Sequence, residues 1–77
     1  MAAFVSFIGF PKEAKIYVDG IEIGEIPLYN HMMKWGSYQI VAEKEGYIPE
    51  MRKDFTIFAS DKSKTILFQL KKIMSEE

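Results

Sequence analysis

The dipeptide Asp19-Gly20 lies between two short runs of alternating apolar and polar residues, and it constrains the fold more than any other feature. Asp-Gly in this setting is typical of a two-residue type I′ turn, whose central residues both need a positive φ. Three cross-strand pairs then form: Val18 with Ile21, Tyr17 with Glu22, and Ile16 with Ile23. Four β-branched side chains therefore share one face of the hairpin, which another layer must cover.

The rest of the chain supplies further strands. Phe4 to Phe10 predicts a strand that is at least partly buried on both faces, and Pro11 to Ala14 predicts a turn with its two charges exposed. The residues Ile26-Pro27-Leu28 predict an extended segment at a sheet edge, because Pro27 has no ladder donor. Three later strands are predicted, with these inward residues: Tyr38, Ile40 and Ala42 in 37–44, Phe55 and Ile57 in 51–58, and Ile66, Phe68 and Leu70 in 64–70.

Short strands at regular spacing, with no amphipathic helix between them, predict an all-β sandwich or small barrel. Structural turns are expected at Asp19, Gly20, Gly24, Gly36 and Gly46. The segment from Tyr29 to Trp35 shows neither alternation nor a helical repeat, so we expect a loop or a short turn of helix. A single domain is expected over residues 1–70, and residues 71–77 are expected to form a short polar, frayed C-terminal tail.

Length and composition exclude several classes of protein. A chain of 77 residues is one small domain, and 48% hydrophobic with 27% charged residues is a globular composition. A net charge of −1 creates no field that would draw the chain to nucleic acid or to an anionic membrane. Because the chain has no cysteine, it has no disulfide framework and no thiolate metal site. The apolar segment Met1–Phe10 lacks a basic start and a cleavage site and is too short to span a bilayer, so a complete chain would be cytoplasmic.

Several spaced residues together resemble one known family. They are Pro11-Lys12-Glu13-Ala14, Ile16-Tyr17-Val18-Asp19-Gly20, Gly24, Pro27-Leu28, Gly36, Tyr38 and Lys44-Glu45-Gly46-Tyr47. This order is similar to the PEGA domain, and the likeness extends through Leu70. The chain departs from the family pattern where Glu13 precedes Ala14 in place of glycine, and where Ile26 replaces the usual Thr before Pro27.

The resemblance implies a small antiparallel Greek-key β-sandwich of the carboxypeptidase regulatory-like and transthyretin-like kind. It implies an accessory module of surface-layer, envelope or signalling proteins, with no enzymatic activity and no cofactor. A chain excised from a larger protein of this family would therefore be found at the cell surface or envelope. A fold of this kind hosts many functions, so the family alone does not identify a partner.

Catalytic and metal sites are not predicted. His31 is the only histidine, and without cysteine or a second histidine it cannot assemble the ordinary metal-ligand sets, so we expect an exposed loop residue. The serines have no acid-base partner other than His31, which makes a Ser-His-Asp triad a poor hypothesis. Asp19 is explained by its turn, and the glutamates near positions 43–50 are expected to be solvated charges at strand ends. Nucleic-acid binding through lysines and neighbouring aromatics is disfavoured by the interspersed acidic residues.

Two binding hypotheses remain. The residues Tyr29, His31, Met33 and Trp35 form a candidate binding loop, for carbohydrate for example, although Met33 and Trp35 could simply cap the sandwich. The preferred hypothesis is an outward-facing apolar surface that includes Val41, Phe58 and Leu67, with Phe4 or Phe7 from the first strand. Such a surface would bind a protein partner or a second copy of the chain, unless the segment 71–74 folds back over Leu67.

Overall fold

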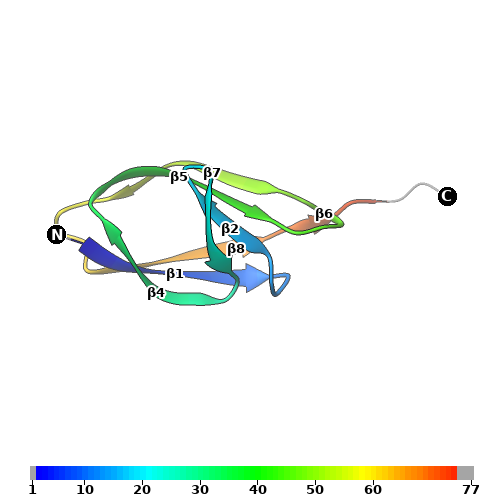
Figure 1. Ribbon diagram of the computed structural model, residues 1–77, viewed down its shortest axis with the longest axis horizontal. Helices are drawn as coiled ribbons and strands as arrows, with labels where there is room; N and C mark the ends of the chain where they lie inside the picture. The colour runs from blue at the N-terminus through cyan, green and yellow to red at the C-terminus, as the bar shows by residue number, and fades with distance from the viewer. Residues whose placement is uncertain (1, 75–77) are drawn as a thin grey trace.

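The computed structural model describes residues 2–74 and contains only strands and turns (Figure 1). The strands are β1 Ala2–Phe10, β2 Lys15–Val18, β3 Ile21–Glu25, β4 Leu28–Lys34, β5 Gly36–Glu43, β6 Tyr47–Ile48, β7 Glu50–Ile57, β8 Ser63–Gln69 and β9 Lys71–Lys72. They form a three-stranded sheet β4-β1-β8, a four-stranded sheet β3-β2-β5-β7 and a two-stranded ribbon β6-β9. The prediction of an all-β fold is therefore confirmed.

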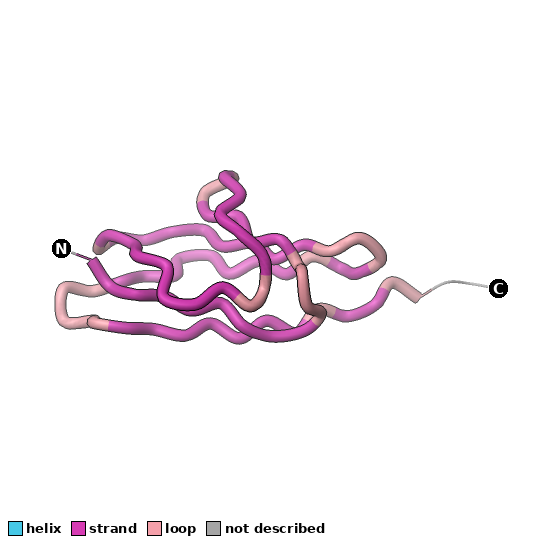
Figure 2. Tube along the Cα trace, turned by 60° about the horizontal axis from the view of Figure 1, so that its bottom comes forward, coloured by secondary structure: helices cyan, strands magenta, loops and turns pink. Residues whose placement is uncertain are grey.

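The two larger sheets lie in two layers along an elongated molecule. Its principal extents are 51 × 20 × 17 Å, and the first and last parts of the described chain lie toward opposite ends of the long axis (Figures 1 and 2). Every strand pair in the described residues is antiparallel except β1 with β8, which run parallel from Phe4 opposite Ser63 to Phe10 opposite Gln69. The parallel pair was not expected from the sequence, because it joins strands from the two ends of the chain.

The β2–β3 hairpin turns at Asp19 and Gly20 with φ values of 50° and 85°, which confirms the type I′ turn. The pairs nearest the turn form as predicted, Val18 with Ile21 and Tyr17 with Glu22. The third pair was predicted wrongly, because a bulge places Gly24, and not Ile23, opposite Ile16. The four β-branched side chains are also not equally covered: Ile16 is fully buried, whereas Ile21 is 69% exposed at the hairpin tip.

Asp19 also connects the hairpin to the neighbouring strand. Its side-chain Oδ1 accepts a hydrogen bond of 2.9 Å from the backbone N–H of Gln39 in β5. Its own backbone N–H donates to the carbonyl oxygen of Gln39 at 2.8 Å. The turn residue therefore fixes the position of the hairpin tip as well as its local conformation.

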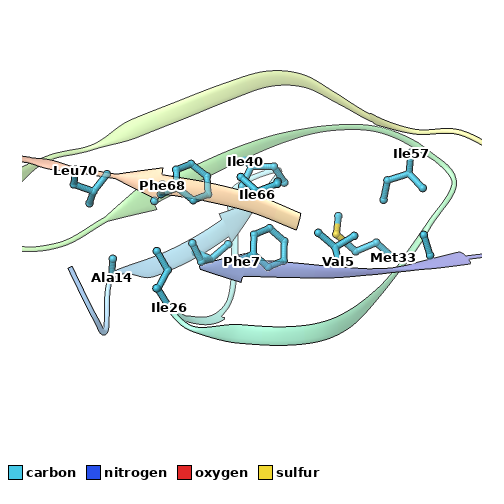
Figure 3. Close-up of a cluster of buried hydrophobic side chains, with 13 residues drawn as sticks. Val5, Phe7, Ala14, Ile26, Met33, Ile40, Ile57, Ile66, Phe68 and Leu70 are labelled. Atoms are coloured by element: carbon cyan, nitrogen blue, oxygen red, sulfur yellow. The ribbon is translucent and has the colours of Figure 1, made fainter. Parts of the chain in front are cut away.

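The core lies between the two large sheets, where alternate side chains of facing strands interdigitate (Figure 3). Its buried hydrophobic residues are Ala3, Val5, Phe7, Ala14, Ile16, Ile26, Met33, Ile40, Ala42, Ile57, Ile66, Phe68 and Leu70. Tyr38 and Phe55 pack against this cluster from partly buried positions. The inward residues predicted for the three later strands are thus confirmed, and the two predicted exposed charges of the Pro11–Ala14 turn are exposed.

Two cationic side chains, Arg52 of β7 and Lys64 of β8, bridge the two large sheets along the side where these strands are the sheet edges. The guanidinium of Arg52 donates to the carbonyl oxygen of Leu67 at 2.7 Å, lies 4.8 Å from the ring centre of Phe68, and pairs with Glu50 at 2.8 Å. The ammonium of Lys64 donates to the carbonyl oxygen of Thr56 at 3.0 Å. The ammonium of Lys64 also lies 5.4 Å from the ring centre of Phe55, so both cations contact an aromatic ring and bond a backbone carbonyl of the opposite sheet.

Three further expectations, about β4, the turn glycines and the tail, are wrong in whole or in part. The segment from Tyr29 to Trp35 is mostly strand β4, at the edge of the three-stranded sheet, and not a loop or a helical turn. Of the glycines predicted at turns, Gly46 is in a turn, with a φ of 86°. Gly24 and Gly36 are not in turns, because Gly24 lies inside β3 and Gly36 is the first residue of β5. The tail is not frayed at its start, because Lys71 and Lys72 form β9 against β6. The remaining tail residues 75–77 lie outside the described part of the chain.

Candidate interaction surface

The four residues of the predicted binding loop do not converge. Tyr29 and Trp35 are exposed, by 65% and 42%, while Met33 is buried in the core. His31 is half-buried and stands opposite Val5, with its ring edge-on to Phe7 at 6.4 Å between ring centres. His31 and Met33 stand opposite Val5 and Ala3 and so share the inner face of β4, whereas the bulge at Asn30 separates Tyr29 from them. Trp35 lies beyond the end of β4.

His31 and Ser6 lie on opposite sides of their sheet. His31 lies on the inner side of the sheet, whereas the hydroxyl of the nearby Ser6 accepts a hydrogen bond from the backbone N–H of Asn30 at 3.1 Å. No three His, Cys, Asp or Glu side chains within residues 2–74 lie close enough to hold a metal ion. The expectation that His31 is an exposed loop residue is wrong, because the ring forms part of the packing beside Phe7.

The three residues of the predicted interaction surface also do not share a face. Val41 is half-buried in β5 and belongs to the four-stranded sheet, whereas Leu67 is 56% exposed on β8 of the other sheet. Phe58 is 60% exposed in the turn after β7, where the ammonium of Lys64 lies 5.8 Å from its ring centre. Of the two first-strand candidates, Phe4 is 47% exposed and Phe7 is fully buried. Only Leu67 and Phe4 therefore remain on one surface.

Leu67 and Phe4 belong to a larger apolar surface on the outer side of the sheet β4-β1-β8. Along β1 the odd-numbered residues 3, 5 and 7 are buried, so the even-numbered residues face outward. Register extends this pattern to both neighbours, because facing residues of paired strands point to the same side. The resulting outward pairs are Phe4 with Met32 of β4, and Ile8 with Leu67 of β8.

We call this surface the apolar face and define it by Phe4, Ile8, Phe10, Met32 and Leu67. Phe4, Met32 and Leu67 are 47%, 62% and 56% exposed. Phe10, 54% exposed, lies at the end of the face, where its ring is edge-on to that of Tyr47 at 5.9 Å between ring centres. Tyr29, 65% exposed, borders it at the β4 bulge. The other outward positions of β1 and β8 are small or uncharged polar residues, namely Ala2, Ser6, Ser63, Thr65 and Gln69.

The exposed apolar area of this face is comparable to the largest patch on a typical soluble monomer. A fully exposed large side chain presents about 150–250 Å², so the apolar face and Tyr29 together expose roughly 500 Å² of side-chain surface. The largest apolar patch on a typical soluble monomer is about 300–600 Å², and patches at the upper end of that range are often functional. The apolar face is therefore a candidate binding surface.

The end of the described chain does not cover the apolar face. After β8 the chain continues along the long axis to pair β9 with β6 (Figure 1). Beyond β9, Ile73 and Met74 are 57% and 88% exposed, and Leu67 is left 56% exposed. Within residues 2–74 the fold-back of the segment 71–74 over Leu67 is thus not observed.

The outer side of the other large sheet has a different character. A cleft of about 480 Å³ is lined there by charged and tyrosine side chains, among them Lys15, Tyr17, Glu25, Glu43 and Tyr47. Desolvation raises the pKa of the Tyr17 phenol above its ordinary value, and the nearby carboxylates Glu43 and Glu22 raise it further. Of the charged residues that line this cleft, the glutamates near positions 43–50 were predicted from the sequence only as solvated charges at strand ends.

The two facing sheets define a small β-sandwich domain with one apolar and one charged outer face. A family model for the PEGA domain matches residues 9–72, so the chain belongs to the PEGA domain family. The resemblance seen in the sequence is thereby confirmed. A comparison with curated proteins finds no match. Residues 2–74 contain no helix long and apolar enough to cross a membrane.

Proposed function

We propose that this chain is a non-enzymatic protein-interaction module that binds a protein partner through the apolar face. The observation that carries the proposal is the set of half-exposed Phe4, Phe10, Met32 and Leu67 side chains on one sheet surface. Covering such a surface removes apolar area from water, which is the main favourable contribution to protein association. Membership in the PEGA family is consistent with this role but does not identify the partner.

The charge distribution supports a protein partner with an apolar, uncharged surface. Lys34 is the only charged residue among the outward positions of β1, β4 and β8, and it lies at one end of the face, opposite Ala2. A charged partner would lose hydration on this surface without finding a counter-charge. The occupant is therefore expected to present aliphatic and aromatic side chains.

The geometry around His31 and the serines favours binding over catalysis. His31 faces the inner side of its sheet and Ser6 the outer side, so the pair cannot form a nucleophile and general base. The carbohydrate alternative has lost its geometric support, because Tyr29, His31, Met33 and Trp35 do not line one site. We therefore assign the candidate function to the surface and not to a pocket.

Site-specific photo-crosslinking in the cells that produce the protein tests this proposal. A benzophenone amino acid replaces Leu67 on the apolar face or, as a matched control, Met51, which is 48% exposed on β7 of the other sheet. We expect position 67 to form a defined adduct with a protein segment, identified by mass spectrometry, and position 51 to form none. Absence of an adduct from position 67, or identical adducts from both positions, would refute the proposal.

A further inference from the structure

The apolar face has the properties of a surface that pairs with itself. We propose that its occupant is a second copy of this chain, packed face to face about a two-fold axis that runs across the strands. This inference rests on the proposed function and names its partner. In such an isologous contact both copies use the same residues, so the surface must be complementary to itself in charge and shape.

The positions of the charged side chains on the apolar face are compatible with this contact. A two-fold axis across the strands places the Ala2 end of β1 in one copy against the Phe10 end in the other copy. The two Lys34 side chains then lie at opposite ends of the contact, separated by about the length of a nine-residue strand, roughly 30 Å. At that distance their repulsion is screened by physiological salt. No like charges are brought together at the centre of the contact.

The opposite outer face does not allow the same pairing. Its strands carry Lys15 opposite both Glu25 and Glu43, and Glu22 opposite Tyr17. Burying these side chains in a symmetric contact would desolvate several charges. The apolar face is therefore the surface of the sandwich on which a second copy fits without burying ion pairs.

The area predicts a reversible dimer. With roughly 500 Å² of large side chains exposed on each copy, face-to-face packing buries about 1,000 Å² in total, which is close to the lower limit for a specific interface. The contact is flat, because it is formed by a sheet, and the axis passes near the small polar pair Ser6 and Thr65, with Ile8 of one copy facing Phe4 of the other. We therefore expect a dissociation constant in the micromolar range or weaker, and a concentration-dependent dimer.

Sedimentation velocity of the purified chain over a concentration series, from about 1 μM to 1 mM, tests the inference. We expect a monomer–dimer equilibrium for the wild type. Leu67→Lys on β8 and Met32→Lys on β4 should each raise the dissociation constant more than tenfold, because each dimer would bury two unpaired ammonium groups. Met51→Lys, on the other sheet, changes an apolar side chain of similar exposure and should leave the dissociation constant unchanged. Circular dichroism checks that each variant is folded.

The outcomes separate this inference from the proposed function. A wild type that stays monomeric up to 1 mM overturns the second-copy inference. If position 67 still forms a foreign protein adduct in cells, the proposed function stands with another partner, and if it forms none, both fail. A dimer that Met51→Lys weakens as much as Leu67→Lys also overturns the inference, because the contact would then lie elsewhere. Since Met32→Lys changes a second strand of the face, the test remains decisive if one variant does not fold.

Discussion

Gly9 in β1 should be the glycine least able to accept a side chain. It lies opposite Phe68 in the parallel β1–β8 pair and has a φ of 140°, which side chains with a Cβ rarely adopt. A Cβ built on Gly9 would overlap the carbonyl oxygen of Phe68 and lie 2.7 Å from its carbonyl carbon. Because both atoms are backbone, β8 itself would have to move. The perturbation we consider is Gly9→Ala.

The cost follows from two separate effects. The unfavourable φ contributes about 1–3 kcal/mol. Displacing β8 also disturbs the packing of Phe68, which is fully buried, and strain from overpacking contributes about 1–3 kcal/mol more. We therefore expect Gly9→Ala to lower the free energy of unfolding by about 2–6 kcal/mol, out of a total of about 4–12 kcal/mol for a domain of 77 residues.

Gly20→Ala is the matched control. Gly20 also has a positive φ, 85°, but a Cβ built there meets no atom within 4 Å. This variant therefore carries conformational strain alone, about 1–2 kcal/mol. The difference in stability between the two variants therefore measures the cost of inserting a Cβ between the β1 and β8 backbones.

Urea unfolding followed by far-ultraviolet circular dichroism measures the difference. For a small domain, each 1 kcal/mol moves the urea midpoint by about 0.3–1 M, so Gly9→Ala should unfold at a lower urea concentration than Gly20→Ala, or have no folded baseline. If the two variants lose equal stability, the β1–β8 approach is not what requires glycine at position 9, and the reasoning is refuted.

Four further predictions concern other parts of the fold. Gly20→Val should lower the free energy of unfolding by about 1–3 kcal/mol, because a β-branched residue is forced to positive φ, and an unchanged thermal midpoint would contradict the type I′ turn. Arg52→Leu should lower the free energy of unfolding in urea by about 1–2 kcal/mol, because it removes the hydrogen bond to β8 and the contact over Phe68 but keeps an apolar side chain. No loss would show that these two contacts of Arg52 do not stabilise the fold. The Tyr17 phenol should titrate above its ordinary pKa of about 10, so the free energy of unfolding should fall as pH rises from that value through the raised folded-state pKa. Tyrosinate absorbance and alkaline unfolding measure this, and Tyr17→Phe should remove the part of the fall that is due to Tyr17. His31→Ala should lower the free energy of unfolding by about 1 kcal/mol through loss of the edge-on contact with Phe7, and a variant as stable as the wild type would show that this contact contributes nothing.

Inward-pointing residues could be predicted from the sequence wherever a strand alternates without interruption. Ile40 and Ala42 in β5, Ile57 in β7 and Ile66 in β8 are buried as predicted, because a period of two separates the two faces of a strand whatever lies beside it. The turn at Asp19-Gly20 was also local, since its conformation depends on the φ preferences of two adjacent residues.

Three features depend on pairing between distant strands and could not be predicted from the local pattern. Strand β4 was missed because its bulge, where Asn30 takes a φ of 55°, breaks the alternation of the segment. The apolar face was only partly foreseen, because Met32 joins Phe4 and Leu67 joins Ile8 through pairings between distant parts of the chain. The parallel register of β1 with β8 is set by how the two sheets close over a shared core, so the surface that we propose to bind a second copy exists only once the strands are assembled.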